Sequence, residues 1–235
     1  MPINIMTGKP YIINYSNMRR ELMEMEIFHD KELQKMYVDK WVAELMEADK
    51  NSVDSYTDPK NQSMIMKEKM EAPEIFRTIV KMKENEMFIH FRVSRIIQML
   101  HMSGITESDA IDISINEFID KMSINWTGTE DFIDREDPII IFPFTIGETY
   151  KELVVDGNHR VTTAIQKKKK IVKAIIVDPN AAVLNHMLSS SFDELLYVFQ
   201  NEVVWMGSHY NENIEDEKIL ITQSYFVCGS VNVAL

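Results

Sequence analysis

The sequence contains few of the residues that build disulfide-stabilised or loop-rich proteins. Among its 235 residues there are one cysteine, seven glycines and seven prolines. A single cysteine excludes an intramolecular disulfide framework and a zinc site made from several cysteines. The low glycine and proline counts disfavour an all-β chain. We therefore expect the protein to reside in a reducing, cytoplasmic environment.

Long hydrophobic runs and positive charge are scarce as well. No apolar stretch approaches the roughly 20 residues that span a bilayer, and residues 1–5 lack the basic start of a signal peptide. The chain has 25 basic and 37 acidic residues, a net charge of -12, and residues 181–235 carry one lysine against seven acidic side chains. Since such a surface repels polyanions, we predict no membrane partner and no non-specific binding of nucleic acid.

Residues 1–104 are predicted to form a large helical region. Apolar residues recur at helical spacing after Asp30, which stands where an N-cap belongs, and a polar stretch at 51–59 predicts a loop. The helical patterns cover residues 30–49, 73–82 and 87–102. Fourteen of the 17 methionines precede residue 104, which favours a methionine-rich helical core over a partner-binding helix face.

After Gly104 the pattern becomes that of a small sheet. Isoleucines alternate with polar residues at the start of this segment, as in a half-buried strand, and short apolar runs follow. The predicted strands are 111–115, 138–142, 150–155 and 171–177, with a helix at 159–170. A further amphipathic helix is predicted to begin near Ser191.

The stretch 154–164 joins a predicted strand to a predicted helix through a glycine turn. The first N–H groups of a helix lack intrahelical partners, and the helix dipole favours an anion there. Gly157 lets a ligand approach the backbone, and Arg160 offers a planar fork suited to phosphate or carboxylate. Asp156 is suited to bind a metal ion or accept a proton, and His159 to act as acid or base. A purely structural turn and helix cap is the alternative, because Asp-Gly is a common turn pair.

Residues 111–178 resemble the ParB/sulfiredoxin superfamily, also described as ParB-like nuclease domains. The matching segments are IDISINEFID, DPIIIFPF, ELVVDGNHRVTTAI and KIVKAIIVD, and the signature is the Asp-Gly-x-His-Arg turn. The resemblance implies an α+β fold with a small mixed β-sheet core over 105–180. A large helical N-terminal region, 1–104, precedes this core, and a C-terminal helical extension, 181–235, packs on it.

The resemblance also implies a nucleotide, ATP, ADP or CTP with Mg²⁺, bound at the glycine turn. The phosphate-binding residues are then Gly157, Asn158, His159, Arg160 and Val161. Asp156 becomes a catalytic or Mg²⁺-linked acid, His159 a second catalytic group, and Glu117 a further candidate acid.

Two departures from the family pattern narrow the function. A sulfiredoxin needs cysteine where Asn158 stands, and a partition protein needs a basic helix-turn-helix domain after Asp178, where one lysine occurs in 57 residues. The favoured function is a nucleotide-dependent phosphotransferase or NTPase acting on a small molecule. The alternatives are a regulatory module that recruits a protein partner through residues 1–104, and a DNA-binding protein or nuclease.

Overall fold

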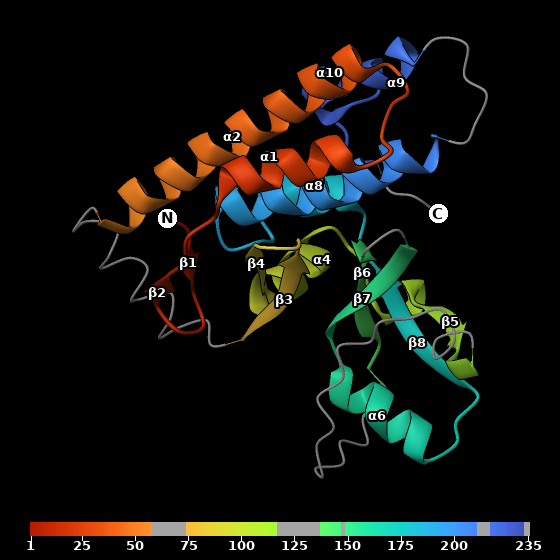
Figure 1. Ribbon diagram of the computed structural model, residues 1–235. Helices are drawn as coiled ribbons and strands as arrows, with labels where there is room; N and C mark the ends of the chain where they lie inside the picture. Colours follow the sequence, from red (N-terminus) through yellow and green to blue (C-terminus); the bar gives the residue numbers. More distant parts are fainter. Residues whose placement is uncertain (58–73, 117–136, 147–148, 211–216, 233–235) are drawn as a thin grey trace.

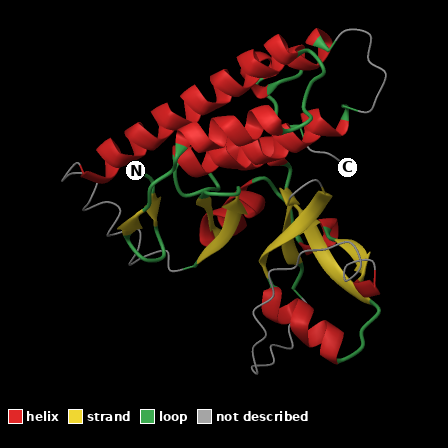
Figure 2. Cartoon of the chain, viewed as in Figure 1, coloured by secondary structure: helices red, strands yellow, loops and turns green. Residues whose placement is uncertain are grey.

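The chain is a mixed α/β protein in which a layer of helices lies over small β-sheets (Figure 1). The computed structural model describes residues 1–57, 74–116, 137–146, 149–210 and 217–232. Figure 2 shows that helices dominate one side of the molecule and strands the other. Within the described residues, no helix has the length and apolar character needed to cross a membrane.

The helical layer consists of three helices that lie side by side (Figure 1). They are α1 (Tyr15–Glu24), α2 (Lys31–Thr57) and α8 (Ser191–Ser208). The predicted N-cap is confirmed, because the Asp30 carboxylate accepts the N–H groups of Glu32 and Leu33 at 3.0 and 3.1 Å. The loop predicted at 51–59 is wrong as far as Thr57, where α2 continues: no glycine or proline interrupts it there. Residues 58 and 59 lie outside the described residues.

A β-hairpin stands where the sequence predicted helices at 73–82 and 87–102. Strand β3 (Ile75–Lys81) pairs antiparallel with β4 (Glu86–Arg92), and only the rest of the second run is helical, as α4 (Val93–Met102). Five of the seven β3 residues are β-branched or aromatic, which favours a strand. The prediction failed because the apolar residues of β3 also fit a helical face, and pairing with β4 decided between the two.

The N-terminal segment is fastened to this hairpin. The short strands β1 (Ile3–Asn4) and β2 (Lys9–Pro10) pair antiparallel, and the N–H of Ile5 donates to His90 Nε2 on β4 at 3.3 Å. On its other side, Nδ1 of His90 lies 2.9 Å from the buried Asp193 carboxylate of α8. The hairpin is therefore held between the N-terminal segment and the helical layer.

The largest sheet has four strands, and their positions agree with the sequence prediction. They are β5 (Ile111–Ser114), β6 (Ile139–Ile146), β7 (Thr149–Asp156) and β8 (Ile171–Ile176). The strand order is β5-β8-β6-β7, with β6 parallel to β8 and the other neighbours antiparallel. The predicted helix at 159–170 is α6 (Asn158–Gln166), which lies on the side of the sheet away from the helical layer (Figure 1).

Strand β6 is apolar on both faces because both faces are covered. Ile139 and Ile141 belong to a small cluster with Val161 of α6, whereas Ile140 and Phe142 belong to the main core beneath the helical layer. Successive side chains of a strand point to opposite faces, so the continuous run predicted at 138–142 fits a doubly covered strand. Burial of each of these large side chains contributes about 1.5–3 kcal/mol.

The C-terminal segment returns to the helical layer. Its long helix α8 packs against α2, β4 and β6, and begins as predicted near Ser191. The other short helices in the described part of the chain are η1 (Glu107–Asp109), α7 (Pro179–Leu184), α9 (Lys218–Thr222) and α10 (Tyr225–Cys228). One hydrophobic core thus receives side chains from the N-terminal, central and C-terminal parts of the chain.

Candidate functional site

The glycine turn between β7 and α6 requires glycine for two separate reasons. Gly157 has φ of +97°, a left-handed backbone conformation that other residues adopt at a cost. A Cβ at this position would lie 2.6 Å from Cγ2 of Ile139 and 2.9 Å from Nε of Arg160. The turn therefore has no room for a side chain.

A β-bulge precedes the turn and offsets the end of β7. Ile140 pairs with Asp156, whereas Ile141 pairs with Val154, so Val155 is an extra residue in the ladder. Bulges commonly re-aim side chains near functional sites. Here the offset places Asp156 at the strand end, directly before Gly157, and both residues line the same cavity.

Helix α6 begins with its amide end directed toward this turn. Among the described residues no side chain caps the helix, whose first residue, Asn158, instead donates from Nδ2 to the Val154 carbonyl at 3.2 Å. Regular helical bonding starts with Val161, whose N–H donates to the Gly157 carbonyl at 3.0 Å. Uncapped amides and the helix dipole together make such a terminus suited to an anion.

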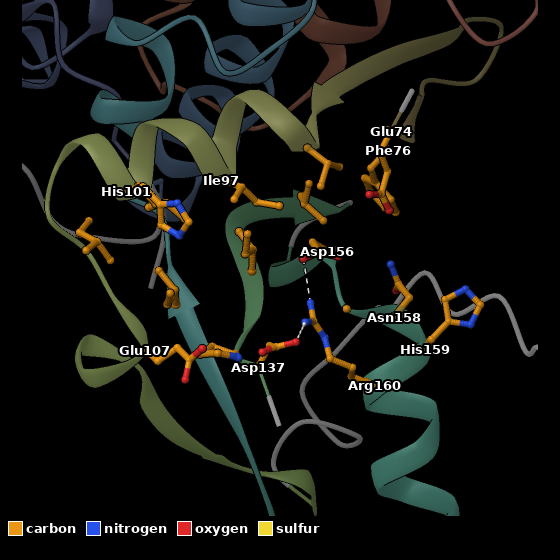
Figure 3. A pocket seen from close by; sticks show the side chains of 18 of the residues that line it. Glu74, Phe76, Ile97, His101, Glu107, Asp137, Asp156, Asn158, His159 and Arg160 are labelled. Atoms are coloured by element: carbon orange, nitrogen blue, oxygen red, sulfur yellow. Dashed lines mark hydrogen bonds and ion pairs between the residues drawn. The ribbon is translucent and has the colours of Figure 1, made fainter. Parts of the chain in front are cut away.

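Arg160 is held at the centre of the site by two carboxylates. Its Nη2 donates to Asp156 Oδ2 at 2.7 Å, and its Nη1 lies 3.6 Å from Asp137 Oδ2 (Figure 3). The Arg160 side chain is 14% exposed, against 22% for Asp156 and 48% for Asp137. The buried Nε of Arg160 and Oδ1 of Asn158 have no hydrogen-bond partner among the described residues. The guanidinium thus keeps a buried, unused donor, Nε, beside the glycine turn.

A cavity of about 660 Å³ opens in front of the turn. The floor comes from the end of β7 and the start of α6, and the roof from α4 and β3 of the N-terminal region (Figure 3). Its volume falls within the range of about 300–1,000 Å³ typical of small-molecule sites. Its lining combines apolar residues with polar ones, as such sites do.

The charged residues of the cavity are mostly acidic. The four carboxylates are those of Glu74, Glu107, Asp137 and Asp156. Arg160 is the one arginine or lysine among the described lining residues, and two histidines, His101 and His159, also line the cavity. Figure 3 places His101 and Glu107 on one side and Glu74 and His159 on the other. An anionic ligand in this cavity would therefore need a cation to accompany it.

Most of the site residues predicted from the sequence meet at this cavity. Asp156, Gly157, Asn158, His159 and Arg160 all line it. The side chain of Val161 is fully buried in the cluster between α6 and the sheet. Glu117 lies outside the described residues.

Sequence reasoning missed the residues that other elements bring to the turn. Asp137 stands two residues before the first residue of β6 and reaches Arg160 because β6 pairs with β7. His101 and Glu107 come from α4 and η1, and Glu74 directly precedes β3. No local motif connects these residues to residues 156–160. The run Glu136-Asp137-Pro138 was the one available signal, since it places acids at the start of the strand paired with the motif.

Comparisons with family models, with curated proteins and with solved structures gave no match to this chain. The similarity of residues 111–178 to the ParB/sulfiredoxin superfamily consequently remains a prediction from the motif. The function must be argued from the geometry of the cavity.

The carboxylates of the cavity suit a Mg²⁺ ion that binds together with a phosphate ligand. They suit a metal ion held by protein side chains alone less well. Within the described part of the chain, no group of three histidine, cysteine, aspartate or glutamate side chains is arranged to hold a metal. Mg²⁺ is usually bound by one or two carboxylates together with substrate phosphates and water. Asp156 and Asp137, which both contact Arg160, provide such carboxylates.

Proposed function

We propose that this protein binds a nucleotide with Mg²⁺ in the 660 Å³ cavity, with the phosphates on the turn 157–160. The observation that carries the proposal is the meeting, at one cavity, of a glycine turn, an uncapped helix start and an arginine whose side chain is 14% exposed. The helix start suits a phosphate group through the helix dipole, and the arginine through charge-assisted hydrogen bonding. The glycine leaves the room in which the Arg160 side chain lies against the turn.

A ParB/sulfiredoxin-like core is part of the same proposal. The order of a strand, a hairpin, a glycine turn, a helix and a final strand supports it. In this interpretation β5–β8 and α6 are the nucleotide-binding unit, and the helical layer covers it.

The activity we propose is transfer of the terminal phosphoryl group to a small hydroxyl-bearing molecule or to water. Asp156 lies beside the phosphate position and accepts the proton of the attacking hydroxyl, whose oxygen forms the new bond to phosphorus. The bond from phosphorus to the bridging oxygen breaks, and the shortened nucleotide leaves. Mg²⁺ supplies charge neutralisation of the phosphates when bound. Arg160 positions the transferred group and compensates its charge.

A non-catalytic nucleotide sensor is the second candidate, favoured by one observation. Asp156 Oδ2 already accepts a hydrogen bond from Arg160 Nη2 at 2.7 Å, so this oxygen must leave the ion pair before it can contact an attacking hydroxyl. A sensor would bind the nucleotide without turnover and pass the signal through the helical layer to a protein partner. A DNA-binding or nuclease function gains no support from the cavity, because Arg160 is the one lysine or arginine among its described lining residues and a nucleic-acid backbone is bound through several such groups.

Calorimetric titration with ATP, ADP, CTP and GTP in Mg²⁺ tests the binding site. We expect saturable binding of at least one nucleotide, with affinity reduced at least tenfold in Arg160→Ala. Arg95→Ala is the matched control, because it removes one positive charge from a half-buried α4 residue that donates to Gln98 and is not among the described cavity lining. Binding that survives Arg160→Ala unchanged, or no binding at all, would contradict the proposal.

Release of inorganic phosphate, or phosphorylation of a set of hydroxyl-bearing acceptors, distinguishes the enzyme from the sensor. The enzyme predicts turnover that Asp156→Asn abolishes while binding persists. The sensor predicts nucleotide binding with no turnover under any of these conditions.

A further inference from the structure

The cavity has two chemically different halves. The floor carries the glycine turn and Arg160, and the roof carries apolar residues of α4 and β3. Phosphates placed on the turn occupy only the floor, so the other half must receive the rest of the ligand or remain filled with water.

Helix α4 is built to present an apolar surface to the cavity. Ile96 is buried in the core and does not line the cavity. The α4 residues that line the cavity recur about one turn apart, and they are Val93, Ile97, Leu100 and His101. The side chain of Ile97 is only partly buried and lines the cavity, although Ile96 beside it packs in the core. Figure 3 shows Ile97 pointing down from α4 toward the turn.

The end of α4 continues this surface. The helix ends at Met102, and Gly104, two residues further on, has φ of +74°. The Ile105 N–H donates to the Leu100 carbonyl at 2.9 Å. This bond is the one that closes a Schellman motif, and it keeps the residue after the glycine beside the last turn. Both Leu100 and Ile105 line the cavity as a result.

Strand β3 supplies the aromatic member of the roof. Phe76 lines the cavity and is held from behind by Phe91, with ring centroids 6.2 Å apart. Since Phe91 is fully buried, Phe76 has a fixed support and leaves its other surface to the cavity. An aromatic ring beside aliphatic residues is a suitable surface for a flat, mostly apolar ring.

We infer that Phe76 and Ile97 bind the nucleoside end of the ligand, an inference that rests on the proposed function. These two side chains then make the site select nucleotides over inorganic polyphosphates. The N-terminal region then supplies half of the binding site, although residues 111–178 alone carry the family resemblance. The roof provides affinity that inorganic phosphates cannot use, because they have no apolar surface to bury.

A comparison of the preferred Mg²⁺-nucleotide with Mg²⁺-tripolyphosphate tests this inference by calorimetry. We expect the nucleotide to bind at least tenfold more tightly than tripolyphosphate to the unmodified protein. Ile97→Ala and, independently, Phe76→Leu should each weaken nucleotide binding about five- to tenfold and leave tripolyphosphate binding unchanged. Met102→Ala is the matched control, because this α4 residue is 70% exposed and stands apart from the described cavity lining.

The outcomes separate this inference from the proposed function. Equal binding of nucleotide and tripolyphosphate, or nucleotide binding that neither substitution weakens, overturns the role of the roof while the phosphate site stands. Failure of both ligands to show Arg160-dependent binding overturns the proposed function and this inference together. Thermal unfolding of each variant shows whether it is folded, and two substitutions on different elements keep the test decisive if one fails to fold.

Discussion

At the scale of single residues, the site depends on Gly157, which directly follows strand β7, and on Arg160, which stands four positions after the last residue of that strand. Gly157 brings the backbone against Ile139, and Arg160 turns back over it to reach Asp156. The two residues are coupled, because a Cβ at position 157 would meet the Arg160 side chain as well as Ile139.

Gly157→Ala is expected to be more destabilising than the same change at another left-handed glycine. The strained φ alone costs about 1–3 kcal/mol, and the contact at 2.6 Å from Ile139 Cγ2 adds to that cost. Gly104→Ala is the control, because Gly104 has φ of +74° and no heavy atom within 4 Å of its added Cβ. Denaturant unfolding measures both, and equal losses at the two positions would refute the close-packing argument.

Asp137→Asn is expected to strengthen nucleotide binding in the absence of Mg²⁺. The substitution removes one of the two carboxylates that compete with phosphate for Arg160, at 3.6 Å and half exposed. Pairs this exposed contribute about 0–1 kcal/mol, so the gain is at most about fivefold. Glu107→Gln removes a cavity charge elsewhere and serves as the control in the same calorimetric titration. A gain equal in both variants would mean that total charge, and not the contact with Arg160, limits binding.

At the scale of elements, the sequence predicted the sheet and α6 well and the N-terminal hairpin badly. Strands β5 to β8 have local signals: alternation, short apolar runs and a glycine turn. The hairpin β3–β4 lacks such a signal, because its turn, residues 82–85, contains neither glycine nor proline. Residues 156–160 were found because they are contiguous, whereas Asp137, Glu74 and His101 join them only through tertiary pairing.

The position of the cavity roof depends on the attachment of β4 to α8, and Asp193→Ala tests that attachment. The buried Asp193 carboxylate accepts the His90 N–H at 3.0 Å, contacts His90 Nδ1 at 2.9 Å and accepts the Ser190 hydroxyl at 2.6 Å. Its removal leaves buried donors without an acceptor, which costs about 3 kcal/mol. Glu194→Ala is the neighbouring control, because Glu194 pairs with the exposed His186 and its loss costs less than about 1 kcal/mol. A similar loss of unfolding free energy in the two variants would contradict this role.

At the scale of the whole molecule, one core joins the helical layer to the sheet that carries the site. Buried residues of α2, β4, β6 and α8 belong to the same cluster. Glu202 lies inside this core and accepts the Tyr37 hydroxyl at 3.0 Å, the Trp41 indole N–H at 3.2 Å and the Tyr225 N–H at 2.5 Å. A buried carboxylate therefore ties α8 to both α2 and α10.

Glu202 is expected to make the stability of the protein depend on pH. Burial raises the pKa of its carboxyl above the ordinary value of 4.5, although three hydrogen bonds oppose the shift. With a raised folded-state pKa, its contribution to stability is full below about pH 4.5 and is lost as the pH rises through the folded-state pKa. Glu202→Gln removes this titration. The free energy of unfolding of the variant, compared with that of the parent, should therefore increase as the pH rises toward neutrality. Glu86→Gln, at an exposed position, should follow the parent; a constant difference for Glu202→Gln would contradict the assignment.

The central claim is that nucleotide phosphates rest on the turn before α6, and backbone amide NMR tests it most directly. The uniformly ¹⁵N-labelled protein would be titrated in turn with the Mg²⁺ complexes of ATP, ADP, CTP and GTP. We predict saturable shifts of the amide resonances of Gly157, Asn158, His159 and Arg160, with little change in α8. Shifts confined to other elements, or none with any of the four nucleotides, would contradict the claim and leave the turn a structural cap.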